Sequence, residues 1–247
     1  MEAMRCIRAI VKRELMSYFE SPVAYVFLVV FLMLTGFLTF FVGRFYEAGQ
    51  ADLRGFFLWH PWVFLILVPA VAMRLWSEER RSGTIESLLT LPITLTQAIL
   101  GKFLAAWLFL AMAILLTFPI VLTTAYLGSP DFGAVCGGYL GSLLLAGTYL
   151  SVGLFTSALS RNQVISFVLA VVFCLLLLLA GLPPLTDTLI RWAPEMLINL
   201  VSAFGFLPHF ESIQRGVVDV RDLLYYASVI VFMLFATHVV VENRKAA

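Results

Sequence analysis

The sequence predicts an all-α membrane protein with six transmembrane helices. Apolar residues make up 62% of the 247 residues and charged residues only 13%, whereas an ordinary soluble domain is about 45–50% apolar. Five stretches of at least 17 residues contain no Asp, Glu, Lys or Arg, and a sixth contains only a histidine. A helix of about 20 apolar residues crosses a bilayer core, because hydrocarbon offers the backbone no other hydrogen-bonding partners. The expected spans are 23–43, 57–75, 98–126, 134–159, 163–182 and 222–241.

Residues 1–22 precede the first span and form a separate amphipathic segment. Over residues 5–20, apolar side chains recur at helical spacing on one face and basic side chains on the other. This pattern predicts a helix that lies on the inner leaflet. Glu14 falls within the apolar face, where an isolated carboxylate is costly, so it is either paired locally or faces a protein partner. Pro22 separates this helix from the first span, since the residue before a proline avoids helical geometry.

The basic residues indicate which side of the membrane is cytoplasmic. With six spans both termini lie on one side, and that side holds eleven of the sixteen Lys and Arg residues but only seven of the fifteen acidic residues. Cytoplasmic loops carry the excess of Lys and Arg, so both termini are expected in the cytoplasm. The basic residues are spread over separate loops and mixed with acids, a distribution that predicts no nucleic-acid partner.

The cytoplasmic segment 77–92, between the second and third spans, carries the strongest indication of a protein partner. Gly83 is a helix stop, Thr84 is an N-cap, and Glu86 lies in the following first turn, where the helix dipole favours an anion. Pro92 ends this unit. A short connector between spans rarely needs a separately capped helix, so we predict a docking helix rather than an ordinary connector.

The predicted docking surface combines charged side chains with a short apolar stripe. A buried apolar anchor surrounded by polar groups is typical of a protein interface. Its residues are Glu14, Glu78, Glu79, Arg80, Arg81, Gly83, Thr84, Ile85, Glu86, Leu88 and Leu89. Immediately after it, Thr94 and Gln97 form a capping box that opens the third span.

Two further patterns concern packing and the external side. Gly133, Gly137 and Gly141 recur every four residues in the fourth span, a spacing that lets helices approach closely. They serve either packing within the bundle or a seam between two copies. Residues 183–221 form the longest external segment, and Asp219 at its end can cap the last span.

The sequence lacks the motifs that nucleotide binding, metal binding, ion coupling or hydrolysis would need. The only Gly-Lys pair, Gly101-Lys102, lacks the rest of a P-loop, and there is no HExxH motif or Cys/His cluster. No span has a charged residue near its centre, which ion-coupled transporters generally need. Ser142 has no evident base among the three histidines, which speaks against an intramembrane hydrolase. We therefore expect no enzyme activity, no metal and no cofactor in this chain.

Three separated segments identify a family resemblance. They are KRELMSYFESPVAY at 12–25, ERRSGTIESLLTLPIT at 79–94 followed by LGK at 100–102, and FESIQRGVVDVRDLLYY at 210–226. In this order they resemble the permease subunits of type-2 ABC exporters. The last segment is most similar to the gliding-motility-associated branch, a relative of the nitrous-oxide-reductase maturation permeases.

The resemblance implies an architecture and a set of partners. It places an interfacial elbow helix at 5–20, a six-span permease domain at 23–247, a coupling helix within 77–92 and short outer-leaflet helices at about 187–212. Such permeases sit in the bacterial inner membrane among its lipids, pair as dimers, and bind a separate ABC ATPase subunit that holds ATP and Mg. A further membrane or periplasmic component is also expected.

The function expected from the resemblance is ATP-driven export, with ATPase motion transmitted through residues 77–92. The alternative is a membrane anchor or mechanical transmitter that recruits a cytoplasmic ATPase complex and transports no substrate. ATPase activity that responds to a candidate substrate in reconstituted vesicles would separate the two. The sequence identifies neither the substrate nor the residues that bind it.

Overall fold

The structure is a bundle of long apolar helices. The computed structural model describes residues 2–83, 93–180, 182 and 203–243, and within them every regular element is helical. Among these residues, six helical segments are long and apolar enough to cross a membrane, in agreement with the predicted all-α class and six spans. These segments are Pro22–Val42, His60–Ser82, Leu95–Leu127, Phe132–Leu159, Gln163–Ala180 and Val220–Asn243.

Three of the six spans are divided by local breaks. In the first, α2 (Pro22–Phe37) passes into a single π-helical turn at Leu38–Val42. In the second, α4 (His60–Ala72) is followed by α5 (Arg74–Ser82), and in the third, α7 (Leu95–Leu115) is followed by α8 (Phe118–Leu127). The undivided spans are α9 (Phe132–Leu159), α10 (Gln163–Ala180) and α14 (Val220–Asn243), and the remaining helices are α1 (Glu2–Glu20), α3 (Arg54–Leu58) and α13 (Phe206–Gln214).

The second span differs from its predicted limits of 57–75. The helix continues through α5 to Ser82, well beyond the apolar residues. The prediction from hydropathy ends the span where the charged residues begin. The helix itself continues past that point, because charged residues such as Glu and Arg are good helix formers. The charged segment therefore extends the span as a helical arm.

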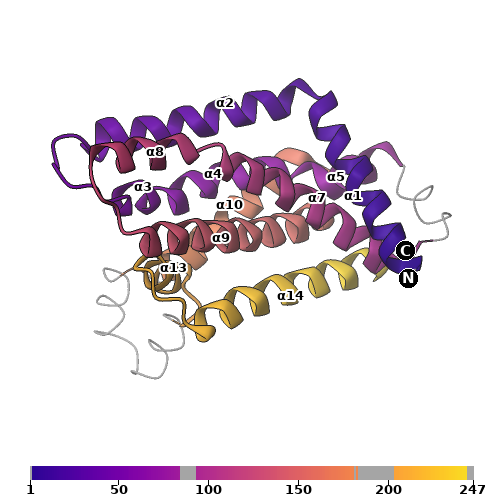
Figure 1. Cartoon of the computed structure of the whole chain (residues 1–247). Helices are drawn as coiled ribbons and strands as arrows, with labels where there is room; N and C mark the ends of the chain where they lie inside the picture. Colours follow the sequence, from indigo (N-terminus) through magenta and orange to yellow (C-terminus); the bar gives the residue numbers. More distant parts are fainter. Residues whose placement is uncertain (1, 84–92, 181, 183–202, 244–247) are drawn as a thin grey trace.

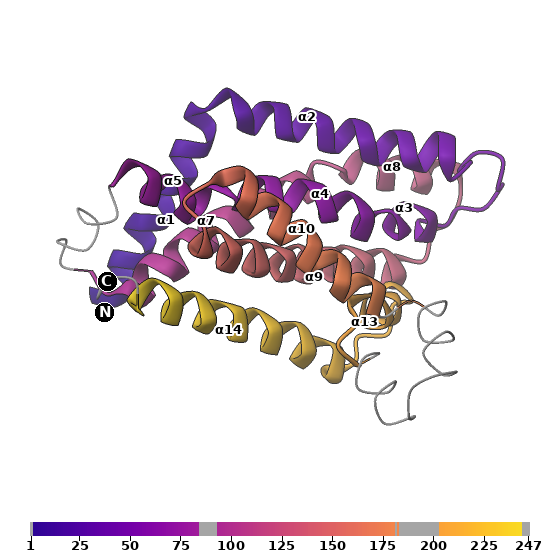
Figure 2. The ribbon, with the colours of Figure 1, turned by 180° about the vertical axis from the view of Figure 1, so that it is seen from behind.

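Helix α9 forms the centre of the bundle. Most of its residues from Ala134 to Ala158 are buried, and α4, α7, α10, α13 and α14 pack around it (Figures 1 and 2). Helix α2 lies at the periphery, and its exposed side chains include Val26 and Met33. Exposed apolar side chains on a peripheral helix are expected where lipid surrounds the bundle.

The glycines of α9 allow this close packing within the chain. A Cβ atom on Gly138 would lie 2.3 Å from the Phe57 ring, and one on Gly137 would lie 2.4 Å from the carbonyl oxygen of Ile213. A Cβ on Gly141 would come within 3.3 Å of the side chains of α13. Packing within the bundle is therefore confirmed for Gly137 and Gly141, and a seam between copies is the wrong interpretation for these two.

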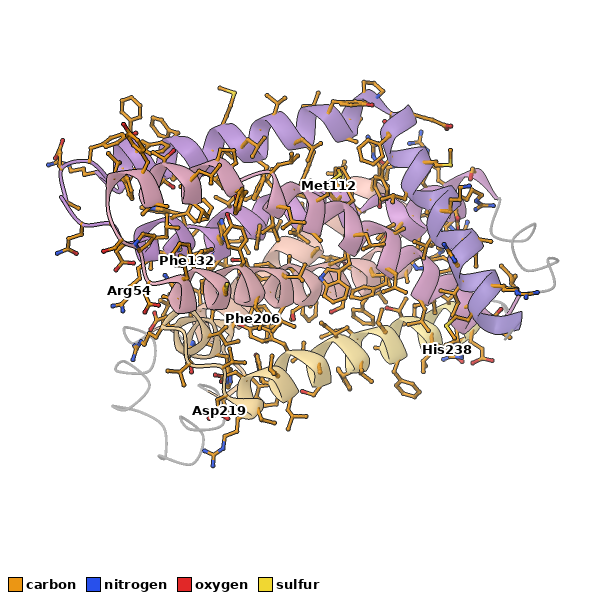
Figure 3. All side chains as sticks on the ribbon, viewed as in Figure 1. Arg54, Met112, Phe132, Phe206, Asp219 and His238 are labelled. Carbon is orange, nitrogen blue, oxygen red and sulfur yellow. The ribbon has the colours of Figure 1, made fainter. Side chains whose placement is uncertain are left out.

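The helices align so that the charged residues gather at the two ends of the bundle. Arg54 and Asp219 lie at one end and His238 at the other, with mostly carbon between them (Figure 3). Helices α1 and α5 lie at the His238 end, and α3 and α13 at the opposite end, in both ribbon views (Figures 1 and 2). At the start of α14, Asp219 accepts a hydrogen bond from the backbone N–H of Arg221 at 2.9 Å, which confirms it as the cap.

Candidate functional site

The α1, α5 and α7 helices converge at the His238 end of the bundle and bring together Glu14 and Glu79, two of the charged residues that the sequence singled out. A break at Ser21, whose backbone is extended, separates α1 from α2 as predicted. Helix α1 then packs along α7 (Figure 1). The approach is close, because a Cβ on Gly101 would lie 2.5 Å from the Ile10 side chain. The absence of a side chain at Gly101 therefore lets α1 reach the neighbouring Lys102.

Lys102 is the centre of a charged cluster formed with Glu14 and Glu79, here called the Lys102 cluster. Its Nζ atom lies 2.7 Å from Glu79 Oε1 of α5 and 3.3 Å from Glu14 Oε1 of α1. The Lys102 side chain is only 4% exposed, against 16% for Glu14 and 18% for Glu79. Removing such a cation from water is costly unless it is paired, so the three side chains hold one another in place.

Two aromatic side chains, Trp76 and Tyr18, lie beside the Lys102 cluster. The Nζ atom lies 5.6 Å from the centre of the Trp76 ring, within the range of a cation–π interaction. Trp76 itself is fully buried. Burial, and then the negative charge of Glu14, raise the pKa of Tyr18, so its phenol stays uncharged beside the carboxylates.

The structure shows the pairing of Glu14, which is one of the two interpretations that the sequence left open. Its carboxylate pairs with Lys102 and also with Arg13 at 3.1 Å. Local pairing is therefore confirmed. The carboxylate connects α1 to α7 within the chain.

A second connection joins α5 to the central helix. Between α4 and α5 the helix is interrupted at Met73, and the backbone N–H groups of Trp76 and Ser77 both donate to Ser157 Oγ of α9 at 3.0 Å. The same hydroxyl donates to the carbonyl oxygen of Met73 at 2.9 Å. One buried serine thus satisfies the backbone groups that the interruption releases, and it fixes the start of α5 on α9.

Replacing Ser157 by alanine should destabilise the protein by about 1–2 kcal/mol, because two buried N–H groups lose their acceptor. The expected readout is a lower apparent melting temperature of the purified protein in detergent. Ser166→Ala is the matched control, since Ser166 is also buried and its hydroxyl has no hydrogen-bond partner among the described residues. Equal melting temperatures for the two variants would contradict the role of Ser157.

The end of α5 also contacts α9. Arg80 Nη1 donates to the carbonyl oxygen of Ala158 at 2.6 Å, close to the end of α9. The helix stops at Gly83, whose positive φ of 73° is a left-handed conformation that glycine adopts readily, so the predicted stop is confirmed. Glu78 and Arg81 are exposed on the same helix.

Part of the predicted docking surface lies outside the described residues. These residues are Thr84, Ile85, Glu86, Leu88 and Leu89. On the far side of this gap the predicted capping box is present: Thr94 Oγ1 accepts from the Gln97 N–H at 3.3 Å, and Gln97 Oε1 accepts from the Thr94 N–H at 3.1 Å. Helix α7 therefore begins at a defined position, seven residues before Lys102.

One expectation about the histidines is wrong. Ser142 was expected to lack a base, but His60 Nδ1 lies 2.6 Å from its Oγ atom, because α4 and α9 pack side by side. Both side chains are completely buried, and Ser142 also donates to the carbonyl oxygen of Gly138 at 2.7 Å. The pair is enclosed by Phe56, Phe57 and Phe64. A nucleophile needs access to its substrate, so this buried pair is a packing contact.

Three residues of this region were missed by sequence reasoning as site residues: Lys102, Trp76 and Ser157. Lys102 had a usable signal, since it is the only charged residue between Glu86 and Asp131. Trp76 and Ser157 have residues of similar type around them in the sequence, so nothing in the sequence marked either of them as a site residue. Among the described residues no group of three His, Cys, Asp or Glu side chains could hold a metal ion.

Comparison with known proteins gives one family match. The sequence model of the family described as "ABC-2 family transporter protein" matches residues 62–241, which include α5, α7 and α9 and therefore most of the region described above. No curated protein matches the chain significantly.

Proposed function

Because the chain belongs to the ABC-2 family of transporter proteins, we propose that it is the permease subunit of an ATP-driven exporter of the type-2 class. Two copies would form the membrane path, and each would bind a separate ABC ATPase subunit that carries ATP and Mg. The chain itself would perform no chemistry. The gliding-motility-associated permeases remain the branch that its motifs most resemble.

The observation that carries this proposal is the attachment of α5 to three other helices. The Lys102 cluster joins α5 to α1 and α7, and Ser157 and the Ala158 carbonyl join it to α9. A partner that pushes on residues 77–92 would therefore move these helices together instead of bending a free loop. Such rigid attachment is what transmission of force requires, since packed elements shift as units.

The arrangement of charges supports the proposed orientation. Helices α1 and α5 share one end of the bundle with the last turns of α14 (Figure 2), and this end carries the excess of basic residues. In the proposed inner-membrane setting it would face the cytoplasm, with both termini and the coupling segment exposed to the ATPase.

An aspartate in the apolar stripe of the predicted docking surface should strongly weaken the binding of the ATPase subunit. We expect Ile85→Asp or Leu88→Asp to reduce the amount of ATPase that co-purifies with the permease by at least tenfold, because the buried centre of an interface tolerates a charge poorly. The measurement is the ratio of the two subunits after affinity purification from membranes.

Val217→Asp is the control for these variants. Val217 is 64% exposed and lies beyond α13, at the opposite end of the bundle, so this change should leave the subunit ratio unaltered. Full co-purification of the ATPase with Ile85→Asp and Leu88→Asp would refute the assignment of residues 77–92 as the docking segment.

A further inference from the structure

An open cleft of about 490 Å³ lies between α1, α2, α4, α5 and α7. Its volume is within the range of about 300–1,000 Å³ that is typical of small-molecule sites. The cleft adjoins the Lys102 cluster but extends well beyond it, from the turn between α1 and α2 into the bundle. Its occupant is not assigned by the proposed function.

One half of the cleft is apolar and belongs to the membrane-spanning helices. Val23, Val26 and Val30 of α2 face Leu67 and Val71 of α4 across it. Val30 lies eight residues beyond Pro22, so the apolar wall extends about 12 Å along α2. Val26 is 60% exposed, which leaves this half accessible from the side of the bundle. An acyl chain entering from the lipid would meet only apolar side chains here.

The other half of the cleft is lined by charged side chains whose charges sum to zero. It is lined by three cations and three carboxylates, which are Arg13, Arg74, Lys102, Glu14, Glu78 and Glu79. Four of these six are joined by ion pairs in and around the Lys102 cluster. The two others, Arg74 and Glu78, lie one turn apart on α5, and no ion pair within the described part of the chain involves either of them.

We propose that this cleft binds one glycerophospholipid of the surrounding leaflet, with a zwitterionic headgroup of the phosphatidylethanolamine class. One acyl chain lies between α2 and α4, and the headgroup lies against α5. The Arg74 guanidinium donates to the phosphate, which it matches in geometry. The Glu78 carboxylate accepts from the ammonium group. The second acyl chain stays in the bilayer.

The balance of charges distinguishes this ligand from an anionic lipid. A lipid with a phosphate alone would satisfy Arg74 but would leave Glu78 facing the negative headgroup, which like-charge repulsion disfavours. A zwitterion satisfies both side chains at once. The cleft also crosses from the polar residues of α5 to the apolar residues of α2, as a lipid crosses from headgroup to hydrocarbon.

Native mass spectrometry of the purified full-length protein tests the proposal, with phosphatidylethanolamine and phosphatidylglycerol of identical acyl chains added in competition. We expect the first bound lipid to be phosphatidylethanolamine, with about a tenfold preference, the value of one charge-assisted hydrogen bond. Glu78→Gln should remove the preference. Arg74→Gln should lower the binding of both lipids about tenfold.

Arg5→Gln is the matched control, because Arg5 is an exposed cation of α1 at the same end of the bundle and does not line the cleft. It should leave both affinities unchanged. Glu78 is exposed, so its substitution tests the site even if Arg74→Gln lowers stability. Equal binding of the two lipids to the unmodified protein, or unchanged binding in both cleft variants, would overturn the proposal. Neither outcome depends on ATPase binding.

Discussion

Lys102→Met is expected to destabilise the protein by about 3 kcal/mol. The substitution keeps a side chain of similar length but removes the cation that lies between Glu14 and Glu79. Both largely buried carboxylates then lose a cation that they contact, although Arg13 still pairs with Glu14, and breaking a buried ion pair costs about 3–5 kcal/mol. We expect the lower end of that range, because both carboxylates keep some exposure and solvent screens them.

This loss should appear as a fall of about 6–12 °C in the apparent melting temperature, at about 2–4 °C per kcal/mol for a chain of this size. Lys12→Met is the matched control, since Lys12 is an exposed cation of α1 and surface substitutions usually change stability by less than about 0.5 kcal/mol. The triple variant Lys102→Met, Glu14→Gln, Glu79→Gln should recover most of the stability, because it also removes the two carboxylates that lose this cation. A single Lys102→Met variant as stable as Lys12→Met would show that the cluster contributes nothing.

Gly153→Ala is expected to cost about 2–3 kcal/mol through the addition of one methyl group. Its Cβ atom would lie 2.4 Å from the Cβ of Ala72, on the face where α9 packs against α4. Ala72 is fully buried and its Cβ is fixed to the helix backbone, so the clash is relieved only by separating the two helices. Overpacking of this kind costs about 1–3 kcal/mol. Separation would also weaken the hydrogen bonds of Ser157, one turn further along α9.

Gly36→Ala provides the same chemical change without the clash. Gly36 lies in α2, and a Cβ atom there would meet no other atom within 4 Å, so its melting temperature should stay equal to that of the unmodified protein or rise slightly, because alanine favours the helix over glycine. The comparison is made by thermal unfolding of both variants in the same detergent. If Gly153→Ala melted at the same temperature as Gly36→Ala, the close contact between α4 and α9 would be wrong.

Local sequence signals accounted for the ends of several helices. The break before Pro22, the stop at Gly83, the capping box at Thr94 and the cap at Asp219 were all predicted from neighbouring residues, because each depends on hydrogen bonds and backbone angles within one turn. The second span shows where such signals are insufficient. Hydropathy marks where apolar residues end, but α5 continues as a helix through charged residues, of which Glu79 pairs with Lys102 of α7.

The sequence by itself determined the all-helical class, the six spans and the segregation of basic residues, since hydrophobic runs and charge asymmetry are properties of the chain read in order. Only the tertiary structure decided that Lys102 joins Glu14 to Glu79, that Ser157 holds the start of α5, and that His60 meets Ser142 in a closed core. Glu14 and Lys102, Trp76 and Ser157, and His60 and Ser142 are separated by 88, 81 and 82 residues along the chain. Their pairing depends on which helix faces pack together, and apolar faces of similar composition do not specify their neighbours.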